Sequence, residues 1–154
     1  MRKKILLSSL LTALVLPAFS AQAGKLPLSE VPQEVINSLK DRHPDAKIIK
    51  VEEEIHFAIK LYEVKFKLNG EKQELLYTPQ GKYFGYEEDI DISELPEAVV
   101  AKLKQTFKKL RIEKAEKIRH PNGDIEYEID VLGNGEEWEL AMDPTGKIWA
   151  KERD

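Results

Sequence analysis

The second half of the chain repeats the first. The segment Ser29–Pro32 (Ser-Glu-Val-Pro) returns as Ser93–Pro96 (Ser-Glu-Leu-Pro), and Tyr62-Glu63-Val64 returns as Tyr127-Glu128-Ile129. The spacing changes from 64 (29 to 93) to 65 (62 to 127), which places one inserted residue between the two matches. Self-similarity at a fixed spacing indicates tandem structural units. We therefore expect two repeats, residues 24–89 and 90–154.

Each repeat shows the same order of expected elements. Apolar residues at helical spacing over 31–39 and 95–103 predict one amphipathic helix at the start of each repeat. We expect Ser29 and Ser93 to cap these helices. Alternating polar and apolar residues then predict strands, separated by Asn-Gly hairpin turns. The fold class is therefore α+β: two tandem repeats, each one helix packed on a four-stranded antiparallel β-meander. A repeat of about 65 residues buries only a modest core, so we expect the two repeats to pack together.

The first residues have the form of a secretory signal. Three basic residues precede an apolar stretch at 5–16, and Ala21-Gln22-Ala23 supplies the small residues that signal peptidase reads. We predict a signal peptide over residues 1–23, cleaved after Ala23, and a periplasmic or secreted mature chain without stable membrane insertion. Loss of three positive charges moves the net charge from −4 to −7. Such an acidic chain is a poor nucleic-acid binder. The absence of cysteine excludes disulfides, a lipoprotein anchor and thiolate zinc sites.

Four short motifs occur in both repeats. They are the Val-Pro or Leu-Pro helix start, the Tyr-Glu-Val or Tyr-Glu-Ile strand, the Asn-Gly hairpin, and the Pro-x-Gly-Lys turn at 79–82 and 144–147. In these motifs the chain resembles the PepSY-like family, also described as β-lactamase-inhibitor-like, over nearly all of its mature length. The resemblance implies an exported bacterial protein with a helix packed on an antiparallel sheet. It also implies a non-catalytic role, such as inhibition of a peptidase or of another protein, and it carries over no catalytic residues.

Charge is segregated in the second repeat. Residues 102–119 hold eight basic and two acidic side chains, whereas residues 120–146 hold eight acidic ones and neither lysine nor arginine. The strand alternation directs Glu128 and Asp130 away from the core, together with Glu137 and Glu139 on the next strand. A turn at Asn134-Gly135 sets Asp130 opposite Glu139, where like charges are unfavourable.

The first repeat and the preceding hairpin predict attractive pairs instead. The equivalent of the Asp130–Glu139 pair is Lys65 opposite Glu74. A two-residue turn at Asn122-Gly123 would set Arg119 opposite Glu126 and Lys117 opposite Glu128. The second repeat has therefore exchanged a balanced sheet face for an acidic one.

This acidic face has two interpretations. Asp130, Glu137, Glu139 and Glu128 meet a basic patch on a partner or a hard cation such as Ca²⁺, or they form a solvated surface. The acidic stretches at 52–54 and 87–91 are interpreted as solvated. A flat sheet lacks the curved loop that calcium usually requires.

Three aromatic residues form a second candidate site. Tyr83 and Phe84 match Ile148 and Trp149 in the repeat alignment. Neighbouring residues of a strand face opposite ways, so at least one ring is either exposed as an anchor for a partner or buried between the repeats.

The remaining chemistry is sparse. His43, His56 and His120 show no metal-ligand spacing, and no nucleophile motif or phosphate-binding loop is present. We expect no catalytic residue, metal site or cofactor. The sequence predicts an exported protein-binding module that inhibits or modulates an envelope or secreted peptidase or other enzyme. The alternative is a periplasmic protein that binds a small ligand or a cation such as Ca²⁺.

Overall fold

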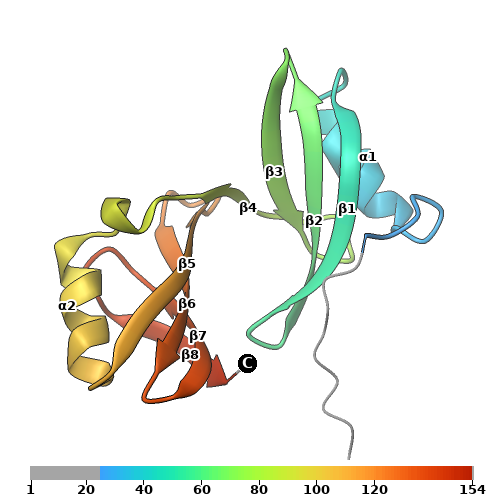
Figure 1. The fold of residues 1–154 in the computed structure, drawn as a ribbon. Coiled ribbons are helices and arrows are strands. Elements are labelled where there is room, and N and C mark those ends of the chain that lie inside the picture. The colour runs from blue at the N-terminus through green and yellow to red at the C-terminus, as the bar shows by residue number, and fades with distance from the viewer. Residues whose placement is uncertain (1–24, 154) are drawn as a thin grey trace, which may run out of the picture.

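A computed structural model describes residues 25–153, so the predicted signal peptide and its cleavage after Ala23 lie outside the described residues. Within these residues, each repeat contains one α-helix followed by four strands (Figure 1). The first repeat holds α1 (Gln33–Arg42), β1 (Lys47–His56), β2 (Ile59–Leu68), β3 (Glu71–Tyr77) and β4 (Tyr83–Asp89). The second holds the short 3₁₀ turn η1 (Ile92–Glu94), α2 (Glu97–Thr106), β5 (Leu110–Arg119), β6 (Ile125–Gly133), β7 (Glu136–Met142) and β8 (Ile148–Arg153).

All eight strands belong to one antiparallel sheet in chain order. The α+β class is confirmed, and the four-stranded meanders of the two repeats are joined into one continuous sheet. Strand β4 of the first repeat pairs with β5 of the second, from Tyr86 opposite Arg119 to Asp89 opposite Glu116. This pairing satisfies the backbone groups that two separate sheets would leave at their edges.

Both helices cover one face of the sheet. Val35 and Leu39 of α1 are fully buried against strand residues such as Val64, and Val99 and Leu103 of α2 occupy the equivalent places. Each helix is preceded by a proline, Pro32 or Pro96, with no side-chain cap. The predicted serine caps are therefore wrong, because proline supplies the extended residue before each helix and Ser93 lies within η1.

The turns decide the register. Asn69-Gly70 and Asn134-Gly135 have positive φ at both residues, as a tight hairpin requires. The loop between β5 and β6 is longer than predicted and runs from His120 to Asp124. The backbone N–H of Asp124 donates to the Asn122 side chain at 3.0 Å and holds this loop. The register therefore sets Ile118 opposite Glu126 and Glu116 opposite Glu128, and the predicted Arg119–Glu126 and Lys117–Glu128 pairs are wrong.

The other side of the sheet carries no helix, and we call it the helix-free face. Leu61, Leu76 and Ile118 are buried there with Phe84 packed on them, so this small cluster joins strands of both repeats. The tip of the β1–β2 hairpin extends toward the second repeat (Figure 1), where His56 contacts β6. The two halves of this face therefore close on each other beside the junction. Within residues 25–153, no helix is both long and apolar enough to cross a membrane.

Candidate functional site

One glutamate from every strand lies along the helix-free face, and we call this set the glutamate row. Four pairs of these residues stand directly opposite each other in neighbouring strands. The second four occupy the positions equivalent to the first four in the repeat alignment. The row consists of Glu52, Glu63, Glu74, Glu87, Glu116, Glu128, Glu139 and Glu152.

Lysines partly neutralise the row in the first repeat. The Lys65 ammonium lies 2.8 Å from Glu63 and 2.9 Å from Glu74, so it forms ion pairs with both carboxylates. Lys50 pairs with Glu52 at 2.5 Å, and Lys114 makes the same contact with Glu116 at the equivalent position of the second repeat.

In the second repeat, the place of the second lysine is taken by a histidine that comes from the first repeat. Where the first repeat has Lys65, the second has Asp130. The imidazole of His56, at the end of β1, instead reaches across the junction: Nε2 lies 3.0 Å from Glu126 Oε1, and Nδ1 lies 2.8 Å from Glu128 Oε2. His120 Nε2 lies 2.7 Å from the other oxygen of Glu126. We call His56, His120, Glu126, Glu128 and Glu139 the histidine–glutamate cluster.

Burial and like charge perturb the titration of this face. Burial, followed by repulsion from Glu116, raises the pKa of Glu87 to about 10. Burial, followed by repulsion from Glu128, raises the pKa of Glu139 to about 9. Burial disfavours the His56 cation, but Glu126 and Glu128 outweigh it and raise the pKa of His56 to about 10. Burial also opposes the charge of Glu128, yet His56 beside it lowers the pKa of that carboxyl. The helix-free face therefore holds more carboxylates than its own cations neutralise.

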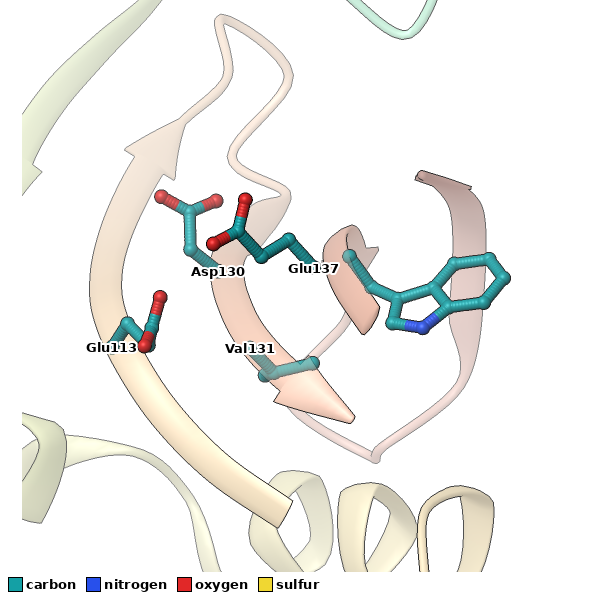
Figure 2. Close-up of a pocket in the computed structure, with 5 residues that line it drawn as sticks. Glu113, Asp130, Val131 and Glu137 are labelled. Carbon is teal, nitrogen blue, oxygen red and sulfur yellow. The ribbon is translucent and has the colours of Figure 1, made fainter. Parts of the chain in front are cut away.

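The acidic residues singled out from the sequence divide between two places. Asp130 and Glu137 line a hollow of about 240 Å³ together with Glu113, Val131 and Trp138 (Figure 2). Figure 2 shows the carboxylates of Asp130 and Glu137 turned toward each other. Glu139 stands opposite Asp130, as predicted. Glu128 does not project freely into solvent as expected, because the folded junction sets its side chain against His56 with 19% exposure.

The aromatic candidates come together at the junction of the repeats. Tyr83, Phe84 and Trp149 line a second hollow, of about 440 Å³, with His120 and Pro121. We call this the aromatic hollow. Phe84 and Trp149 are each the extra residue of a β-bulge at equivalent positions of the two repeats. A bulge redirects a side chain, which explains why simple alternation did not place these rings.

The rings of the aromatic hollow differ in exposure. Phe84 packs on the apolar cluster of the helix-free face, and its ring lies 5.1 Å from that of His120. Trp149 is 42% exposed, 6.4 Å from the His120 ring. The hollow is therefore a partly buried aromatic floor with one exposed indole.

Sequence reasoning missed the histidine–glutamate cluster and the glutamate row. Spacing along the chain gave no reason to associate His56 with Glu128, because the contact depends on the closure of one half-sheet over the other. The row had a signal, however. The repeat alignment itself matches glutamate with glutamate at all four positions of each half.

The comparisons with known proteins agree with this architecture. The profile of the family described as "beta-lactamase-inhibitor-like, PepSY-like" matches residues 18–85 and again residues 82–150. No curated protein matches the chain.

Several solved structures share the fold. A DUF2874 family protein from Bacteroides uniformis has 19% identity and a TM-score of 0.55, over 79% of this chain and 88% of that one. A "putative periplasmic" protein from Bacteroides eggerthii has 19% identity and a TM-score of 0.54, over 80% and 88%. A BLIP-like protein from Bacteroides fragilis has 19% identity and a TM-score of 0.51, over 84% and 89%.

Proposed function

The chain belongs to the β-lactamase-inhibitor-like, PepSY-like family, and from this premise we propose that it is an exported, non-catalytic module that binds another exported or envelope protein. The observation that carries the proposal is the aromatic hollow at the junction of the repeats. Tyr83, Phe84 and Trp149 arrive there from two repeats and leave an indole open to solvent. Aromatic anchors in partly desolvated pockets dominate the affinity of many protein interfaces.

The acidic side chains of the second repeat indicate the chemistry of the partner. In the hollow of about 240 Å³, the second repeat presents exposed Glu137 and half-buried Asp130. Such a surface favours a partner with a basic contact region and accelerates its approach. We expect an apolar side chain of the partner to enter the aromatic hollow while its basic residues face Asp130 and Glu137.

Binding of this kind acts by covering a surface. The β-lactamase-inhibitor-like description of the family supports an enzyme as the partner, and an exported peptidase is the class that the resemblance favours. The BLIP-like name of the Bacteroides fragilis protein is consistent with the same mode of action. The periplasmic description of the Bacteroides eggerthii protein supports an envelope location.

Site-specific photocrosslinking tests the proposal. A photoreactive phenylalanine analogue replaces Trp149 in the full chain expressed in the source organism, and crosslinked proteins are identified by mass spectrometry. The matched control places the same analogue at Ile92, which is 40% exposed but lies on η1, away from the aromatic hollow. We expect one exported protein to crosslink from position 149 and not from position 92.

A second variant tests the role of charge. Glu137→Lys with the analogue at position 149 should reduce the yield of that crosslink, because it reverses the charge of a side chain expected to face the partner's basic residues. The same set of crosslinked proteins from positions 149 and 92, or no crosslink from 149, would reject the aromatic hollow as the binding surface. Addition of the purified chain to the purified partner then measures whether its enzymatic activity falls.

A further inference from the structure

We propose that the histidine–glutamate cluster binds a divalent cation of the zinc class, with His56 Nδ1 and carboxylate oxygens of Glu128 and Glu139 as its protein ligands. One ligand atom from each of the three residues lies within 4.8 Å of the other two. The ligands come from β1 of the first repeat and from β6 and β7 of the second. The ion would therefore fasten the two halves of the helix-free face together.

The two nitrogens of the buried His56 ring have different surroundings. The ring is 5% exposed, and its Nε2 faces Glu126 Oε1 at 3.0 Å. Its Nδ1 is fully buried and makes no hydrogen bond, although Glu128 Oε2 lies 2.8 Å away. Histidines that bind metals commonly donate one ring N–H to a carboxylate and direct the other nitrogen at the ion. His56 already has this arrangement, with Nε2 facing Glu126 and Nδ1 facing the candidate ligand Glu128.

A second layer of contacts fixes the orientation of His56. Glu126 is 4% exposed and its second oxygen lies 2.7 Å from His120 Nε2. The other nitrogen of His120 lies 3.2 Å from the Phe84 carbonyl. This chain from backbone to imidazole to carboxylate holds the His56 ring in one orientation. Such supporting contacts raise metal affinity because the ligand needs little ordering on binding.

The charge of the site favours a cation. Glu139 stands opposite both Asp130 and Glu152 in the sheet, so three carboxyl groups lie side by side there. The equivalent glutamate of the first repeat, Glu74, has the ammonium of Lys65 at 2.9 Å. The second repeat has an aspartate at the position of that lysine, so a bound divalent ion would supply the positive charge there.

The donor set selects among divalent cations. Calcium takes six to eight oxygen ligands and magnesium about six, most of them waters or carboxylates. One imidazole nitrogen with two carboxylate oxygens matches zinc, which is commonly held by three protein ligands and a water.

Calorimetry and thermal unfolding with ZnCl₂ test the proposal on the purified chain after treatment with a chelator. We expect one equivalent of Zn²⁺ to bind and to raise the melting temperature, because the ion binds the folded state alone. CaCl₂ and MgCl₂ at the same concentration should not raise it. Glu139→Gln should weaken Zn²⁺ binding by at least ~10-fold, whereas the control Glu137→Gln, outside the cluster, should leave binding unchanged.

The variant Glu139→Gln keeps the test decisive, because it leaves the contacts of His56 with Glu126 and Glu128 in place. Without metal it should unfold no earlier than the unmodified chain, since it removes one of several adjacent carboxylates. Imidazole ¹⁵N spectra identify the ligand directly: Zn²⁺ should shift Nδ1 of His56 and leave His43 and the nitrogens of His120 nearly unchanged. Absence of saturable binding, equal loss in both glutamine variants, or shifts confined to His43 or His120 would overturn the proposal.

Discussion

The two repeats present the same four glutamates on the helix-free face but neutralise them differently. The first repeat holds Lys65 between Glu63 and Glu74, within its own strands. The second repeat has Asp130 at that position and receives the His56 side chain from the first. The first repeat therefore completes this part of its charge balance internally, while the second completes it only in contact with its neighbour. Duplication has produced two units of one fold of which the second depends on the first.

The cores of the repeats differ in a complementary way. At the end of the helix the first repeat has His43, with its ring 5.4 Å from Phe66, and the second has Phe107. Opposite Phe107 the second repeat has Gly133, where the first has the larger Leu68. The larger ring of the second repeat fits because the strand beneath it carries no side chain. The same backbone therefore accommodates two packings through paired changes of size.

The largest expected effect comes from removing the cation that crosses between the repeats. His56→Ala removes the imidazole between buried Glu126 and half-buried Glu128. Loss of one partner of a buried ion pair commonly costs about 3–5 kcal/mol. The pKa of His56 is raised to about 10, above its ordinary 6.5. Its contribution is therefore complete below about pH 6.5 and is lost as the pH rises through about 10. Denaturant unfolding at about pH 6 and about pH 10 measures this, and the difference between the two proteins should shrink at the higher pH.

A matched substitution separates the inter-repeat contact from histidine packing in general. His43→Ala removes a half-buried ring that packs on Phe66 of the same repeat, and it should lower the unfolding free energy less than His56→Ala. An ion pair across the junction would be contradicted if both variants lost the same unfolding free energy, or if the loss in His56→Ala did not depend on pH.

An intermediate effect is expected from the paired cores. A Cβ added at Gly133 would lie 2.2 Å from Phe107 Cδ1 and 2.5 Å from Cε1, so Gly133→Ala forces the ring to move. Overpacking of this kind typically costs about 1–3 kcal/mol. Chemical denaturation measures the loss of unfolding free energy. In a double-mutant cycle Phe107→Leu should recover part of it, since contacting residues couple. If the effects of the two substitutions on the unfolding free energy are strictly additive, the Phe107 ring and Gly133 are not energetically coupled.

The sequence was informative wherever an interaction is local or is repeated along the chain. Helical spacing, strand alternation and the Asn-Gly turns predicted the elements, and the turn at Asn134-Gly135 predicted the opposition of Asp130 and Glu139. The five-residue loop at 120–124 shifted the adjacent register by one residue, because its length depends on a side-chain contact of Asn122. The pairing of β4 with β5 and the approach of His56 to Glu128 depend on how one half-sheet closes on the other. No spacing along the chain encodes that closure.

The smallest expected effect tests whether the glutamate row is equally buried in both repeats. Glu87 lies on an inner strand at the junction, is 5% exposed, and has one oxygen without a hydrogen-bond partner. Its equivalent in the second repeat, Glu152, lies on the edge strand β8 and is half-buried. The pKa of Glu87 is raised from 4.5 to about 10 by burial and then by Glu116, so the folded chain binds a proton there that the unfolded chain releases.

This proton stabilises the fold fully below about pH 4.5, and its contribution is lost as the pH rises through about 10. Glu87→Gln keeps a neutral side chain at every pH, so its unfolding free energy should fall less with pH than that of the unmodified chain. We expect the difference between the two unfolding free energies to widen by about 1–2 kcal/mol from about pH 6 to about pH 9. Glu152→Gln is the matched control, and urea unfolding across this range measures all three proteins. A parallel pH dependence for Glu87→Gln and the unmodified chain would show that Glu87 is ionised in the fold, and that the junction of the two repeats admits more water than its geometry indicates.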